Sequence, residues 1–151
     1  MSNSRNIRQN LIPIINRINN ACLKKQTFIK MFQFSNMTII FLKCMLSLGL
    51  IRQFNIVKKS IPLHYPTILY DTRDFINVTI KINKYIAVIK KISILSTSTK
   101  GLFVTNNQLK NLLQKNLTIK YLLHTPQYGL IDCKRALKLN TGGELICSIV
   151  C

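Results

Sequence analysis

A Gly-Gly-Glu motif near the C-terminus is the feature that most constrains the fold of this chain. Gly142 and Gly143 stand between a short basic helix, predicted after Asp132, and an apolar strand predicted for residues 145–150. Because glycine lacks a Cβ, the pair permits either a positive φ or an approach by another segment that a side chain would block. The motif therefore predicts a helix that turns into a strand and packs closely against a loop or a partner.

The segment before this motif predicts a strand, a tight polar loop and the basic helix. Residues 121–124 form the predicted strand end, and residues 125–129 form the loop. The Asp132 carboxylate can accept hydrogen bonds from the first turn of the helix, and Asn140 can end the helix in a left-handed conformation. Three cations lie on this predicted helix: Lys134, Arg135 and Lys138.

This arrangement resembles the C-terminus of the bacterial-type small-subunit ribosomal protein eight family, which has a Ser-Thr-Ser-Lys-Gly loop, a basic helix, Gly-Gly-Glu and an apolar strand. Counting back from Gly142 puts the family's loop glycine on Gly129 and its loop lysine on Tyr128. The other loop positions fall on Thr125, Pro126 and Gln127. Residues 96–101 look more like the family loop, but they lie at the wrong distance from Gly142 to be the RNA loop.

The N-terminal region predicts a helix over residues 11–23, preceded by a basic polar arm at residues 1–10. Pro13 fits such a helix in its first turn, because a deeper proline would remove a hydrogen bond. The run Asn-Arg-Ile-Asn-Asn-Ala at residues 16–21 resembles the family's Thr-Arg-Ile-Arg-Asn-Ala. The resemblance implies that Arg17 and Asn20 contact RNA, and the alternative for this face is plain solvated surface.

The order of elements predicts an α+β protein with two small domains. Residues 1–95 predict two helices on a three- to four-stranded sheet, with the second helix at residues 36–48 capped by Ser35 and ended by Gly49. The apolar face predicted for this second helix is made of Met37, Ile40, Phe41, Cys44 and Leu48. Residues 85–94 predict a strand that closes this domain, and residues 58–76 an insertion. Residues 96–151 predict a small β-rich RNA-binding domain with short helices.

Charge and residue types narrow the class of function. The 22 lysines and arginines against four acids give a net charge of +18, which favours a polyanionic partner, either nucleic acid or an anionic membrane. Four acids and two histidines at no recognisable motif spacing argue against an enzyme, so we expect no catalytic residues and no cofactor. The five cysteines lack Cys-x-x-Cys spacing and predict buried apolar residues in a reducing compartment, without a metal site.

The resemblance implies a structural constituent of the small ribosomal subunit that binds a helical element in the central domain of its rRNA and supports assembly. Lys134, Gly142 and Gly143 join the loop in the predicted RNA site, and Glu144 is predicted to brace the loop. The expected partners are the rRNA and neighbouring ribosomal proteins, with no membrane and no homo-oligomer. A composition rich in Asn, Ile and Lys suggests that this ribosome is organellar and mitochondrial, with the plastid as the alternative compartment. The alternative function is that of a basic membrane-surface protein.

Overall fold

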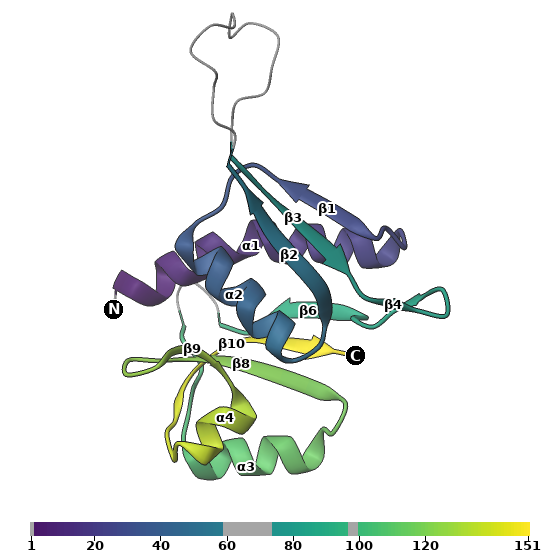
Figure 1. Ribbon diagram of the computed structural model, residues 1–151. Helices are drawn as coiled ribbons and strands as arrows, with labels where there is room; N and C mark the ends of the chain where they lie inside the picture. Colours follow the sequence, from purple (N-terminus) through teal and green to yellow (C-terminus); the bar gives the residue numbers. More distant parts are fainter. Residues whose placement is uncertain (1, 59–73, 97–99) are drawn as a thin grey trace, which may run out of the picture.

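The computed structural model describes residues 2–58, 74–96 and 100–151 (Figure 1). Most of the predicted insertion at residues 58–76 lies outside the described residues. The helices are α1 (Ser2–Leu23), α2 (Asn36–Ser47), α3 (Asn106–Lys115) and α4 (Cys133–Lys138). The strands are β1 (Phe28–Met31), β2 (Ile51–Val57), β3 (Phe75–Ile80), β4 (Ile82–Asn83), β5 (Ile86–Ala87), β6 (Lys91–Ile94), β7 (Phe103–Val104), β8 (Ile119–Thr125), β9 (Gly129–Asp132) and β10 (Gly143–Val150).

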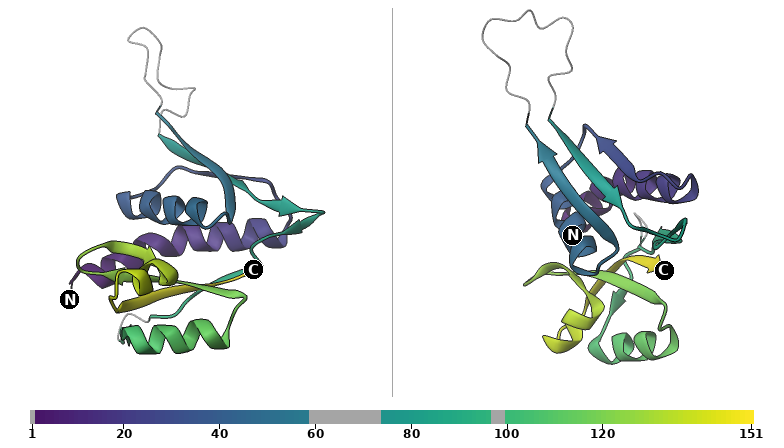
Figure 2. Two further views of the ribbon diagram at one scale, coloured as in Figure 1. Left: turned by 60° about the horizontal axis from the view of Figure 1, so that its bottom comes forward. Right: turned by 45° about the vertical axis from the view of Figure 1, so that its right-hand side comes forward.

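These elements form layers in which helices alternate with two sheets. The first sheet has the order β1-β3-β2 and is antiparallel. Helices α1 and α2 lie between this sheet and a second one, and α3 and α4 cover the far face of the second (Figure 2). The predicted α+β class, with two N-terminal helices on a three-stranded sheet and a β-rich C-terminal part with short helices, is confirmed.

The first helix begins earlier than the sequence predicted, so the prediction of a basic arm at residues 1–10 is wrong. Ile7 and Arg8 are buried, and Ile7 continues the apolar face of Leu11 and Ile14 by one turn. Pro13 therefore lies inside α1. An interior proline costs about 3 kcal/mol. Burying one isoleucine or leucine returns roughly 1.5–3 kcal/mol, so the extra buried turn offsets the break.

Helix α2 starts and ends where its sequence predicted. Ser35 and Thr38 form a reciprocal capping box, and Gly49 follows the helix with a φ of 70°. The buried face, however, is rotated from the predicted one: Phe41 is buried, whereas Ile40, predicted on the same face, is 40% exposed. The reason is that α2 packs on β9 as well as on the first sheet, where the Cys44 thiol donates to the Leu130 carbonyl at 3.4 Å. The remaining buried residues of α2 are Thr38, Leu42 and Met45.

The second sheet has the order β6-β10-β8-β9, and β7 also pairs with β10. The predicted strand at residues 85–94 is divided: residues 82–87 form the hairpin β4–β5, and β6 pairs antiparallel with β10. Strand β6 thus belongs to the sheet of the second half rather than to the first. Asn19 of α1 fixes it there, because its side chain both donates to the carbonyl and accepts from the N–H of Ile92.

The two halves of the chain share one apolar core. Leu122, Ile146 and Ile149 of the second sheet pack in the same cluster as Leu11 of α1 and Phe41 of α2. A smaller cluster under α3 and α4 contains Leu109, Ala136 and Leu145. The helices of the described residues include none that is both long and apolar enough to cross a membrane. A division into two domains at residue 95 stays a prediction.

Candidate nucleic-acid interface

The loop at residues 125–129 is the tip of the β8–β9 hairpin. Thr125 and Gly129 form the last strand pair, and Pro126, Gln127 and Tyr128 form the exposed turn beyond it. Gly129 has a φ of 70°, a conformation that closes three-residue hairpin loops and that glycine adopts without strain. The sequence predicted the loop and its glycine correctly but missed β9, because four residues ending in the helix cap give no clear strand pattern.

The Thr125 side chain holds the turn in one shape. Thr125 is buried. Its hydroxyl accepts a hydrogen bond from the Tyr128 N–H at 3.0 Å and donates one to the Gly129 carbonyl at 3.4 Å. Because a hydroxyl can donate and accept at once, one residue satisfies two backbone groups of the loop. Tyr128 is left with 47% of its surface exposed, so its ring is available to a partner.

Strand β10 lies beside β8 in the sheet, and its first residue, Gly143, approaches the base of the hairpin closely because it has no side chain. A Cβ on Gly143 would lie 2.5 Å from the His124 carbonyl oxygen and 3.0 Å from the Thr125 methyl carbon. A Cβ on Gly142 would lie 2.5 Å from the carbonyl oxygen of Val104. Of the two alternatives predicted for this pair, the close approach is confirmed, and positive φ is found instead at Gly49 and Gly129.

Glu144 is buried, but its partner differs from the predicted one. Its carboxylate forms an ion pair with the guanidinium of Arg8, in the second turn of α1, instead of bracing the loop at residues 125–129. Gly101 closes the same site, because a Cβ there would lie 2.9 Å from Glu144 Oε1. Glu144 still stands close to the hairpin through the backbone, since it pairs with His124 across β10 and β8. Burial lowers the pKa of His124, and the nearby Glu144 charge partly opposes this.

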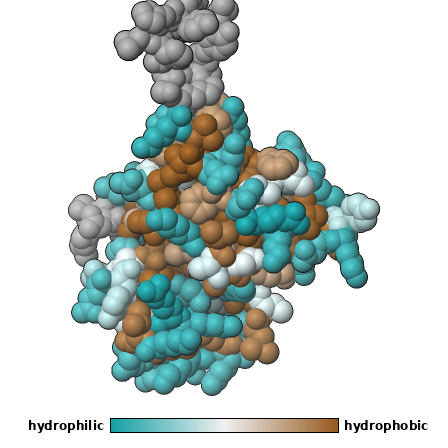
Figure 3. Space-filling view, viewed as in Figure 1, coloured by the Kyte–Doolittle hydropathy of each residue, from teal (hydrophilic) through white to brown (hydrophobic). Residues whose placement is uncertain are grey.

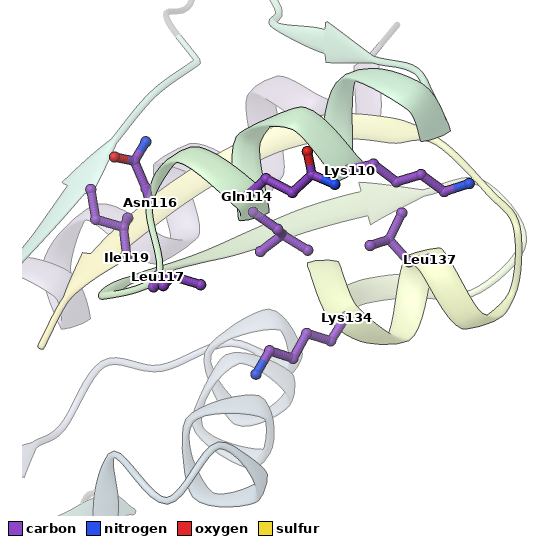
Figure 4. Close-up of a pocket in the computed structure, with 8 residues that line it drawn as sticks. Lys110, Gln114, Asn116, Leu117, Ile119, Lys134 and Leu137 are labelled. Atoms are coloured by element: carbon purple, nitrogen blue, oxygen red, sulfur yellow. The ribbon is translucent and has the colours of Figure 1, made fainter.

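Helix α4 presents cations beside the hairpin strands. Asp132 caps it as predicted, accepting from the Lys134 N–H at 3.3 Å, and burial raises the pKa of Asp132. Asn140 ends this segment with a φ of 53°, the predicted left-handed conformation. The Lys134 side chain borders a groove of about 330 Å³ between α3 and α4, with Lys110 on the other helix (Figure 4).

The structure does not bring Arg17 and Asn20 to the hairpin. Both are exposed on α1, and Arg17 donates to the carbonyl of Lys30 on β1 at 2.9 Å. Arg17 is nine residues beyond Arg8, which places it about 13 Å further along the helix from Glu144 at 1.5 Å per residue. The predicted site residues therefore form a cluster around the hairpin and β10, with Arg17 and Asn20 on a separate surface.

Arg8 is the residue near this site that the sequence reasoning missed. The sequence predicts a polar arm at Arg8, although its spacing from Leu11 and Ile15 would place it on the buried face of a helix. A buried arginine needs a carboxylate, and the chain has four acids to choose from. Among the described residues, no group of three or more His, Cys, Asp or Glu side chains could hold a metal ion.

Comparison with known proteins identifies the family. No curated protein matches the chain. A family model, described as ribosomal protein S8, matches residues 10–150 and so covers nearly the whole chain. The match includes the hairpin, the basic helix and the glycine strand described above. The chain belongs to the ribosomal protein S8 family, and it is a non-enzymatic, structural protein of the small ribosomal subunit that binds the central domain of the 16S rRNA.

Proposed function

We propose that the β8–β9 hairpin and the start of β10 form the surface that binds a helical element of the rRNA central domain. The residues assigned to it are Thr125, Pro126, Gln127, Tyr128, Gly129, Lys134, Gly142 and Gly143. The observation that carries this proposal is the contact of Gly143 with the hairpin, where a Cβ would lie 2.5 Å from the His124 carbonyl oxygen. This contact places the start of β10 against the end of β8, from which the exposed turn projects.

The chemistry of the turn suits recognition by shape and stacking. Pro126 has no N–H to donate, so the turn relies on Tyr128, whose half-exposed ring can stack on a base or a ribose. Lys134 is exposed on α4 and supplies a positive charge for the phosphate backbone. Glu144 supports the same strand indirectly, since its ion pair ties the start of β10 to α1.

Arg17 and Asn20 would act at a different place. Their exposure on α1 is compatible with a second contact to rRNA or with a neighbouring ribosomal protein. Because Arg17 already donates to the Lys30 carbonyl, its guanidinium is held in position and keeps further donors for a phosphate.

The compartment proposed for this protein is the mitochondrial matrix, within the mitochondrial ribosome, with the plastid as the alternative. The support is compositional, because a chain rich in Asn, Ile and Lys is typical of an AT-rich organellar coding sequence. We expect one copy in each small subunit and no homo-oligomer. Mass spectrometry of small subunits purified from each organelle tests the compartment directly.

Filter binding to a transcript of the helical element, over a series of salt concentrations, tests the hairpin. Tyr128→Ala should weaken binding by about tenfold, the effect expected from one lost stacking contact. Ile56→Ala is the matched control, since Ile56 is 39% exposed on β2 of the first sheet, outside the proposed RNA surface, and this variant should bind as the parent does. Equal affinity of the Tyr128→Ala variant and the parent would place the RNA elsewhere on the protein.

A further inference from the structure

A second surface lies at the end of the first sheet where β3 finishes and β4 begins. The α1–β1 turn and the β4–β5 hairpin project side by side there in all three ribbon views (Figures 1 and 2). We call it the hairpin-end surface, made of Lys24, Lys25, Phe28, Lys84, Tyr85 and Ile86. In Figure 3 this right-hand edge is mostly hydrophilic, with hydrophobic residues beside it.

The fold, and not sequence proximity, brings these two turns together. Phe28 of β1 pairs with Thr79 of β3, and the Ile80 N–H donates to the Thr27 carbonyl at 2.8 Å. Strand β4 then begins at Ile82. The β4–β5 hairpin is therefore attached to the strand end that the α1–β1 turn already contacts.

The large side chains of this surface are highly exposed to solvent. Tyr85 is 86% exposed, Phe28 70% and Ile86 66%. An aromatic ring with so little contact contributes little to the stability of the fold, because stabilisation follows the apolar area removed from water. Two rings and one isoleucine so exposed at one end are typical of a surface that contacts a partner.

The backbone conformation of the β4–β5 hairpin also indicates a functional surface. Lys84 and Tyr85 are the two central residues of the turn, with φ values of 45° and 69°. This is the geometry of a type I′ turn, which Asn-Gly fits best and which strains residues with larger side chains. Lys25, in the neighbouring turn, also has a positive φ of 54°. Strained non-glycine residues concentrate at functional sites, and here the two strained residues in the turn of the hairpin are a lysine and a tyrosine.

The charge of the surface selects the chemistry of its partner. Lys24, Lys25 and Lys84 are all exposed. Of the acids in the described residues, Asp132 and Glu144 belong to the second half, and Asp74 precedes the far end of β3, about 20 Å away along six residues of strand. Lysines with open aromatic rings match nucleic acid, because phosphates take the charge and bases or riboses stack on the rings.

We propose that the hairpin-end surface binds a second segment of the small-subunit rRNA, an unpaired stretch or loop whose base stacks on Tyr85. This inference rests on the rRNA-binding function of the family but not on the β8–β9 hairpin. Lys84 and the lysines of the α1–β1 turn neutralise the phosphates on either side of the stacked base. The protein then holds two separate parts of the folded RNA, one at each surface.

The turn geometry supplies a test variant that should not harm the fold. The double substitution Lys84→Asn with Tyr85→Gly introduces the residues that a type I′ turn prefers, so the urea midpoint should stay equal or rise. The probes are a transcript of the whole central domain and a short transcript of its helical element alone. Binding to the whole domain should weaken by about tenfold or more, with a salt slope lower by roughly one contact, while binding to the short transcript stays unchanged.

Two further variants separate this proposal from the function of the β8–β9 hairpin. Tyr85→Phe keeps the ring and should retain binding to the whole domain, whereas Tyr128→Ala should weaken binding to both transcripts. If Tyr128→Ala has no effect, the β8–β9 site is wrong and the hairpin-end result stands by itself.

Three results would overturn the proposal. One is parental affinity of the Asn-Gly variant for the whole domain. Another is a lower urea midpoint of that variant, which would show that Lys84 and Tyr85 serve the fold. The third is parental RNA affinity combined with loss of a neighbouring protein from reconstituted subunits, which would make the hairpin-end surface a protein contact.

Discussion

Breaking the ion pair between Arg8 and Glu144 should destabilise the protein far more than breaking a surface pair would. The two side chains are exposed by 7% and 4% respectively, so each charge has lost most of its water. Removing one partner of a buried pair leaves an uncompensated buried charge, which costs about 3–5 kcal/mol. An exposed pair contributes roughly 0–1 kcal/mol. Since a domain's whole stability is about 5–15 kcal/mol, Glu144→Ala should remove a large part of it.

A double-mutant cycle measures this coupling directly. The variants are Arg8→Met, Glu144→Gln and the double substitution, each unfolded with urea at neutral pH. Methionine keeps much of the length of the arginine side chain, and glutamine keeps the shape of the carboxylate, so the cycle removes charge with little change in volume. We expect each single variant to lose about 3 kcal/mol and the double variant to lose less than their sum by about 2 kcal/mol.

The matched control is Arg52→Met, an exposed arginine on β2, for which we expect a change within about 0.5 kcal/mol. The reasoning is refuted if Glu144→Gln and Arg52→Met unfold at the same urea concentration, or if the cycle shows additive losses. The same variants should bind the short rRNA transcript somewhat less tightly, because Glu144 pairs with His124 at the base of the hairpin.

Two further predictions follow from the titrating groups. Because the pKa of His124 is lowered in the folded state, the unfolded state binds a proton more readily as the pH falls through about 6.5. The stability of the protein should therefore decline from pH 7.5 to pH 5. His124→Gln should flatten this decline, measured as the urea midpoint at each pH. Burial raises the pKa of Cys133 and Cys147 to about 12, so iodoacetamide at pH 8 should alkylate them only in urea; rapid alkylation in the native state would contradict their placement.

Local signals in the sequence predicted the elements whose ends carry their own markers. Helix α2 has a capping serine and a terminal glycine, and both act as expected. The close approach at Gly142 and Gly143 was one of the two alternatives that the glycine pair predicted, although its partners, Val104 and His124, lie elsewhere in the chain. The helix ends depend on neighbouring residues alone, so a few sequence positions are sufficient to predict them.

The features that the sequence did not reveal depend on partners far away in the chain. Because residues 85–94 follow β3 in the chain, the sequence predicts β6 in the first sheet, yet its partner is β10, some fifty residues later. Likewise, the buried face of α2 shifted from the expected stripe because β9 packs against the helix from the second half. The residue pattern within α2 or β6 does not reveal these partners, because the contacts are made between the two halves of the chain.

The ion pair between Arg8 and Glu144 is a long-range contact for which the sequence nevertheless contains signals. The apolar spacing from Ile18 back to Ile7 extends α1 beyond Pro13, and on that longer helix Arg8 lies on the buried side. A buried guanidinium restricts the choice to four acids, and Asp132 is already used as a helix cap. Glu144 follows two glycines that admit another segment at close range, which makes it the acid best placed for burial. The start of α1 is the part that the sequence hides, because the cost of the interior Pro13 is evident locally, whereas the buried turn at Ile7 and Arg8 that offsets it appears only in the folded protein.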